Sequence, residues 1–188
     1  MTPLHLRFGT AALAAAGSPA LGPPARAASL TVGVEIPRLQ VAEYHRPYVA
    51  VWIERADNSV ASTLAVWYDL KLKNAEGTKW LKDMRQWWRR TGRELDLPID
   101  GVTSPTRPVG KHTLEFTEGK APLAALPAGN YKLVVEAARE VGGRELVSIP
   151  FTWPAAQATS QQAQGQTELG AITLQVKPYI CPLPWSSR

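Results

Sequence analysis

The sequence predicts an all-β protein, an immunoglobulin-like antiparallel β-sandwich of seven to eight strands with one inserted amphipathic helix. Three observations indicate this fold. From Ser29 onward, apolar residues mostly alternate with polar ones in short runs, which is the period of a strand with one buried face. Clusters of Gly, Asn, Asp and Pro separate these runs and predict turns. Only residues 78–90 change to the period of a helix.

The predicted strands are short and follow one another along the chain. The first places its apolar residues at positions 30, 32, 34 and 36, so that one face is apolar. Residues 155–167, rich in Gln and Ser, are expected to form a flexible linker or a long surface loop. An open α+β sheet is the alternative architecture. The expected strands are residues 30–36, 48–54, 64–72, 110–118, 131–138, 145–153 and 169–176.

The helix predicted over residues 78–90 has an apolar stripe and a charged remainder. Arg89 and Arg90 in its last turn suit the negative end of the helix dipole, and Gly92 is a suitable stop. We expect the stripe to pack on a sheet. Its members, spaced i, i+1, i+4, i+7 and i+8, are Trp80, Leu81, Met84, Trp87 and Trp88.

The N-terminal residues have the layout of a secretory signal. A single basic residue, Arg7, precedes a short apolar run, and Ala25-Arg26-Ala27 forms an A-x-A cleavage site. The sequence therefore predicts a signal peptide over residues 1–27, a sandwich domain over 28–177 and a disordered, proline-rich tail over 178–188. After cleavage we expect an exported chain that does not span a membrane.

Charge and cysteine content exclude two classes of protein. The formal net charge of the whole chain is +5, and loss of Arg7 and Arg26 leaves 5 − 2 = +3. A net positive charge this small is lower than is typical of a nucleic-acid-binding protein. The only cysteine, Cys181, cannot form an intramolecular disulfide, so the fold is not a disulfide framework.

No catalytic constellation stands out, and we expect a protein that is not an enzyme and has no catalytic residues. No Gly-x-Ser-x-Gly elbow occurs. His45 and His112 are the only histidines after cleavage, and neither has a second His or Cys at ligand spacing, so no metal site is expected. We expect His45 to lie on a loop and His112 to be a semi-buried, hydrogen-bonded side chain.

Four blocks of sequence, in this order, resemble a family of predicted periplasmic proteins, domain of unknown function 2271. The resemblance implies a periplasmic location. Because members of that family accompany PepSY-type membrane reductases and flavin transferases, it also implies extracytoplasmic electron transfer or iron handling, with such membrane proteins as partners. The blocks are Arg46-Pro47-Tyr48-Val49-Ala50-Val51-Trp52-Ile53-Glu54, the stretch from Lys79 to Arg89, Asp100 to Gly110, and Leu126 to Glu140.

The loop after the helix is similar to the pattern at which flavin transferases attach FMN. In that pattern an Asp is followed by Ser/Thr-Gly-Ala-Thr, and the last threonine takes the FMN phosphate. Asp100 and Thr103 match it, and Thr106 would be the attachment residue. Ser104 and Pro105 stand where glycine and alanine are expected, and the proline fixes φ and adds bulk. The alternative is an ordinary surface loop that carries no cofactor.

The helix and the loop over residues 98–110 together form the expected binding surface. An exposed Trp88 would stack on a planar ring, while arginines hold carboxylates or phosphates; the alternative is that the helix tryptophans are core. The arginines of this surface are Arg85, Arg89, Arg90 and Arg107. We expect a non-enzymatic accessory or binding protein linked to flavin- or iron-related redox; the alternatives are a carrier of FMN at Thr106 and an adhesion or scaffold module.

Overall fold

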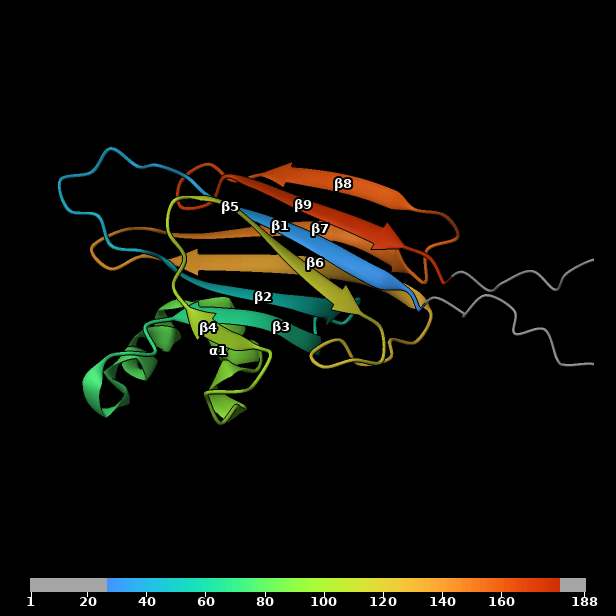
Figure 1. Ribbon diagram of the computed structural model, residues 1–188, viewed down its shortest axis with the longest axis horizontal. Coiled ribbons are helices and arrows are strands. Elements are labelled where there is room, and N and C mark those ends of the chain that lie inside the picture. The colour runs from blue at the N-terminus through green and yellow to red at the C-terminus, as the bar shows by residue number, and fades with distance from the viewer. Residues whose placement is uncertain (1–26, 180–188) are drawn as a thin grey trace, which may run out of the picture. The chain divides into compact units, whose positions relative to one another are not determined.

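Nine strands in two sheets form the framework of residues 27–179, the part of the chain that the computed structural model describes (Figure 1). The predicted signal peptide, apart from Ala27, and the predicted tail beyond Tyr179 lie outside the described residues. The four-stranded sheet has the order β5 (Gly110–Thr117), β1 (Ser29–Ile36), β9 (Ala171–Lys177), β8 (Thr159–Gln164). The five-stranded sheet has the order β4 (Thr103–Pro105), β3 (Val60–Tyr68), β2 (Tyr48–Arg55), β6 (Gly129–Ala138), β7 (Arg144–Trp153). The predicted sandwich is confirmed.

The main core lies between the two sheets. In β1 every second residue is buried, as the alternation predicts, and these side chains meet the inward faces of β2 and β6. All strand pairs are antiparallel except β3 with β4, which is parallel. Burial of this apolar surface is the main stabilising contribution to the sandwich.

A helical layer covers the outer face of the five-stranded sheet and forms a second core. It consists of η1 (Lys73–Asp83), α1 (Arg85–Arg90) and η2 (Gly92–Glu94). Leu81, Met84 and Trp87 pack there against outward-facing residues of the sheet, among them Trp52 and Val134. This second contact explains why β2 and β6 are apolar on both faces instead of alternating.

The predicted continuous helix over residues 78–90 is wrong in one respect: the chain breaks at Met84. Residues before it wind mainly as a 3₁₀ helix, and Met84 itself has φ −77° and ψ 73°, outside the helical region. At 3.0 residues per turn, Leu81 and Met84 lie on one face, whereas Trp80 is rotated away from Met84. Trp80 is accordingly 49% exposed, and it does not belong to the buried stripe.

The helical segment ends where expected, but for a different reason. Thr91 donates its backbone N–H to the Trp87 carbonyl, and Gly92 does not adopt the left-handed conformation of a typical helix stop. Instead, a Cβ at Gly92 would lie 2.6 Å from the Trp87 ring. Glycine is needed here because the indole packs directly against the backbone.

Two strands were not predicted. Residues 155–167, expected as a linker or surface loop, contain the edge strand β8, whose backbone pairs with β9 from Thr159 to Gln164. Its side chains are polar because most of them face solvent, so the apolar period that marks a strand is missing. The second is the three-residue β4, which is too short for any period to appear.

Five connecting segments meet at one end of the sandwich, which we call the cleft end. These segments, which we call the loops of the cleft end, are residues 37–47, 69–84, 106–109, 139–143 and 165–170; the second of them includes η1. The strand registers place them together, since Ile36 pairs with Gly110 and Tyr48 with Ala138. Figure 1 shows the loops after β1 and β6 at the same end of the sandwich as the first coils of the helical layer. The start of β1 and the end of β9, where Ser29 pairs with Lys177, lie at the opposite end.

Candidate functional site

The cleft end contains a cleft of about 570 Å³ between the helical layer and the loops. Four segments that are far apart in the sequence meet around it. They contribute Tyr44, His45, Arg46 and Tyr48; Asp69, Lys71, Leu72, Trp80 and Asp83; Pro105 and Thr106; and Ala138, Arg139, Glu140 and Val141. Each segment includes or adjoins one of the blocks that carry the family resemblance.

The rim of the cleft is apolar and exposed. Trp80 is 49% exposed, and Tyr44 and Leu72 are 37% and 40% exposed. Large apolar side chains in water gain free energy when a ligand covers them, at about 25 cal/mol per Å². The rim therefore favours a ligand with an apolar or planar aromatic part.

The tyrosines at the cleft are held in the neutral form. Burial raises the pKa of Tyr48, and it raises the pKa of Tyr44 even though two arginines nearby oppose the shift. Neutral phenols both donate and accept hydrogen bonds. The cleft thus offers hydroxyl groups to a polar ligand at any physiological pH.

Charges around the cleft are balanced. Arg46 and Lys71 are exposed beside the carboxylates of Asp69, Asp83 and Glu140. A lining of this kind matches a ligand with both polar and apolar parts better than a strongly anionic one. His45, on the loop as expected, bonds to Glu43 through Nε2 at 2.9 Å and lies 3.6 Å from Glu140.

Arg139 forms a rigid wall of the cleft. Its side chain is 6% exposed, and Nε and one terminal nitrogen donate to the Glu168 carboxylate at 2.8 and 3.1 Å. The hydrogen bond to Glu168 raises the pKa of Arg139, so the guanidinium stays charged. Glu168 also accepts the Gly143 backbone N–H at 2.8 Å, which ties the turn between β6 and β7 to the loop before β9.

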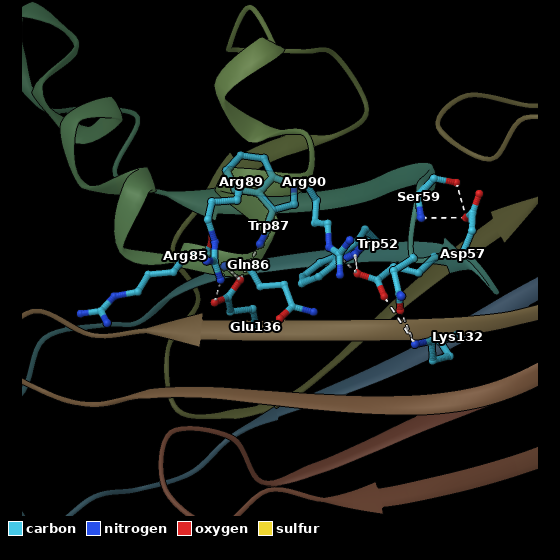
Figure 2. A network of polar contacts seen from close by, with 12 residues as sticks. Trp52, Asp57, Ser59, Arg85, Gln86, Trp87, Arg89, Arg90, Lys132 and Glu136 are labelled. Atoms are coloured by element: carbon cyan, nitrogen blue, oxygen red, sulfur yellow. Dashed lines mark hydrogen bonds and ion pairs between the residues drawn. The ribbon is translucent and has the colours of Figure 1, made fainter.

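A buried carboxylate anchors the helical layer to the sheet (Figure 2). Glu136 of β6 is fully buried, and it accepts the backbone N–H groups of Gln86 at 3.1 Å and Trp87 at 2.8 Å. Arg144 donates to the same carboxylate at 2.7 Å. The negative charge thus lies at the first turn of α1, where free N–H groups point outward.

A second buried carboxylate, Glu54, lies further along the same face. It accepts the indole N–H of Trp52 at 3.0 Å, and it lies 3.8 Å from Arg90 and 3.7 Å from Lys132. Figure 2 shows the Glu136 carboxylate directed at the helical layer. The contact with Arg90 places Glu54 beside the end of α1. In the sequence, each of these anchors is a Glu inside an apolar strand. Such a Glu could have been predicted to have hydrogen-bonded or charged partners, because a buried carboxylate is stable only with them.

Of the three residues expected to bind FMN, only Thr106 reaches the cleft. The Thr103 hydroxyl instead donates to the Ile99 carbonyl at 2.9 Å and accepts the Ile99 N–H at 3.1 Å, so it closes a turn. Asp100 is exposed in that turn and lines a different hollow, together with Val102. The structure does not bring these residues together.

The five residues of the expected binding surface are also dispersed. Arg85 and Arg89 are exposed on α1, whereas Arg90 faces Glu54 and Trp88 is half-buried. Arg107 lies over the ring of Trp67 at 5.5 Å from its centroid, and Trp67 belongs to the core between the sheets. Arg107 and α1 are therefore on opposite faces of the five-stranded sheet.

Sequence reasoning missed the wall and rim of the cleft, which include Arg139, Tyr44 and Val141. The family resemblance could have indicated part of this site, because two of its blocks contain the cleft residues Arg46 and Arg139. His112 is as expected: it is half-buried, bonds to the Pro108 carbonyl at 2.8 Å and packs edge-on against Trp67.

Residues 27–179 contain neither a membrane-spanning helix nor a cluster of metal ligands. Within this range, no helix has both the length and the apolar character needed to span a membrane. The same range contains no group of three or more His, Cys, Asp or Glu side chains placed to hold a metal ion.

Comparison with known proteins identifies the family of this chain. A model of the family described as "Predicted periplasmic protein (DUF2271)" matches residues 29–171. No curated protein and no solved structure matches the chain. The matched range runs from the first strand to the start of the last, so it includes every segment around the cleft. The chain belongs to the DUF2271 family of predicted periplasmic proteins.

Proposed function

We propose that this protein is a non-enzymatic periplasmic binding protein that holds its ligand in the cleft at the end of the sandwich. The observation that carries the proposal is the convergence of four distant segments on one cleft with an exposed tryptophan at its rim. Trp80 is 49% exposed, whereas Trp87 of the same helical layer is fully buried, so the Trp80 indole is accessible to a ligand in the cleft.

The chemistry of the lining supports binding rather than nucleophilic catalysis. Among the described residues around the cleft, no hydroxyl is hydrogen-bonded to a histidine or a carboxylate, as an activated nucleophile requires. The side chains with polar partners are instead fixed in place, as Arg139 is by Glu168. A pre-organised wall beside an apolar rim is typical of a ligand site.

The finer part of the proposal is a role in flavin- or iron-related redox outside the cytoplasm, with a PepSY-type reductase or a flavin transferase as partner. This part rests on the family resemblance. A flavin ring fits the apolar rim, since Trp80 and Tyr44 offer aromatic faces to a planar heterocycle.

The second candidate is a carrier of covalent FMN at Thr106. It is favoured by the position of Thr106, half-buried at the cleft and on the same lining as Trp80. Against it, Thr103 is engaged in a turn and Asp100 lies elsewhere, so a transferase would have to unfold this segment to read the whole pattern.

The test is to purify the mature protein from its own periplasm and to record its absorption spectrum and its native and denatured masses. We expect a noncovalent adduct in the native mass that disappears on denaturation. The Trp80→Ala variant should lose it, whereas Trp88→Ala, which alters a half-buried tryptophan away from the cleft, should keep it. A bare native mass for the wild type would contradict ligand binding.

The same masses decide the second candidate and the export prediction. A mass increase from FMN joined through its phosphate would favour the carrier if it survives denaturation and maps to the peptide with Thr106. It should be absent from Thr106→Ala. An unmodified peptide, produced together with a flavin transferase, would end that alternative. A mature chain that begins at Ala28 would establish signal cleavage after Ala27.

A further inference from the structure

The exposed large apolar side chains are concentrated at one end of the molecule. Among residues 27–179 there are eight of them, and seven lie on the loops of the cleft end. The eighth, Tyr179, follows β9 at the opposite end. Isolated exposed apolar residues are normal on a protein surface, but seven on four segments that meet at one end indicate a contact surface.

The backbone conformation of Val141 is independent evidence that the exposed apolar side chains have a function. It lies at the tip of the turn between β6 and β7 and is 77% exposed, the highest value in the set. Its φ is +51°, a left-handed conformation that a β-branched residue rarely adopts. A strained backbone that presents an apolar side chain to water points to function, because glycine or asparagine would fit the turn better.

Basic side chains lie between these apolar ones. Leu70-Lys71-Leu72-Lys73 is exposed throughout, and Lys79 and Lys82 are exposed on either side of Trp80. The loops of the cleft end together carry eight basic and six acidic side chains, a formal net charge of +2. Leucine and tryptophan among lysines is the composition of surfaces that lie in a membrane interface.

We propose that the cleft end docks on an anionic lipid surface, with Trp80 and Val141 inserted at the level of the headgroups. Lipid fits this surface better than a protein partner does, because lysine is depleted in protein–protein interfaces, whereas here lysines flank Leu72 and Trp80. The described chain ends at β1 and β9 face away from the bilayer in this orientation. The mouth of the cleft then opens toward the membrane.

This inference goes beyond ligand binding, and vesicle binding by the purified protein can be measured without a ligand in the cleft. The mature protein is sedimented with vesicles of phosphatidylglycerol and phosphatidylcholine, and with vesicles of phosphatidylcholine alone, at low and high salt. We expect binding to the anionic vesicles that weakens with salt. Lys73→Gln removes a basic residue that does not line the cleft, and should weaken binding about fivefold, since each lysine near an anionic surface contributes about 1 kcal/mol.

The decisive variant is Val141→Asn. Asparagine tolerates the left-handed conformation, so we expect the variant to be at least as stable as the wild type while binding anionic vesicles several-fold more weakly. Tyr179→Ser, which removes an exposed aromatic at the opposite end, is the matched control and should bind as the wild type does.

Three results would overturn the proposal: no wild-type binding to anionic vesicles, equal binding to neutral ones, or unchanged binding by Val141→Asn. Self-association that Trp80→Ala abolishes, without vesicle binding, would assign the surface to a second copy of this chain. Weaker vesicle binding by Lys73→Gln, which lies outside the cleft lining, with the native-mass adduct retained separates this inference from the proposed function.

Discussion

Trp80 and Trp87 lie seven residues apart in one helical pattern, yet the structure uses them in opposite ways. Trp87 is fully buried against the five-stranded sheet, and Gly92 lies directly on its ring. Trp80 is half in water at the rim of the cleft. The first stabilises the helical layer, and the second is available to a ligand or a membrane.

The difference comes from where the segment is anchored. Glu136 fixes α1 by accepting two of its first backbone N–H groups, so the residues after Met84 are held on the sheet. The preceding 3₁₀ winding turns Trp80 outward. An apolar stripe in a sequence therefore does not distinguish core from contact surface when the helix changes its winding within the stripe.

The largest effect should come from Trp87→Ala. Removal of a fully buried indole leaves a cavity between the sheet and α1, and we expect a loss of about 3–5 kcal/mol in the free energy of unfolding. Denaturant titration measures it. A loss below about 1 kcal/mol would show that the helical layer is not coupled to the sandwich, and the comparison would fail.

Glu136→Ala tests the anchor itself. It leaves the N–H groups of Gln86 and Trp87 without their carboxylate, and we expect a loss of about 2 kcal/mol. Hydrogen exchange should quicken in α1 and not in β1. Glu136→Gln, which keeps one acceptor oxygen, is the control and should be destabilised less; equal exchange in both regions would contradict a local anchor.

Glu145 extends the comparison to the loop before β9, which is also held by a carboxylate. Burial raises the pKa of Glu145, but hydrogen bonds from the backbone of Gln166, Leu169, Thr167 and Glu168 outweigh it, so the pKa lies below its ordinary value of 4.5. A depressed carboxyl pKa contributes stability that is present above the unfolded pKa and is lost as the pH falls through the folded pKa.

We therefore expect the free energy of unfolding to decrease as the pH falls below about 4.5, and to decrease less in Glu145→Gln. Denaturant titrations at neutral and acidic pH measure the difference. The same decrease in both proteins would show that this carboxylate does not hold the loop.

The smallest effect on stability belongs to Trp80→Ala. Because this indole is 49% exposed, we expect a change within about 0.5 kcal/mol, although ligand and vesicle binding should both weaken. A loss as large as that of Trp87→Ala would place Trp80 in the core and remove the contrast on which the proposed site rests.

Much of the fold was predictable because strands with one buried face leave a period of two in the sequence. The alternation in residues 30–36 is the burial pattern of β1. β8 was not predictable, because its backbone hydrogen bonds to β9 do not depend on side-chain type. Its side chains are mostly exposed and polar, so no alternation of apolar residues marks the strand. The candidate site was predicted only through Thr106, because Arg139, Tyr44 and Trp80 are close in space and distant along the chain.

By itself, the sequence determined the two-sheet sandwich, the presence of a helical segment after the third strand and the membership in a family of predicted periplasmic proteins. These follow from local periodicity and from contiguous blocks of residues. Only the tertiary structure decided which tryptophan is core and which is exposed, and which carboxylates are anchors. These properties depend on contacts between residues far apart in the chain, such as Glu136 with Trp87, and local patterns carry no record of them.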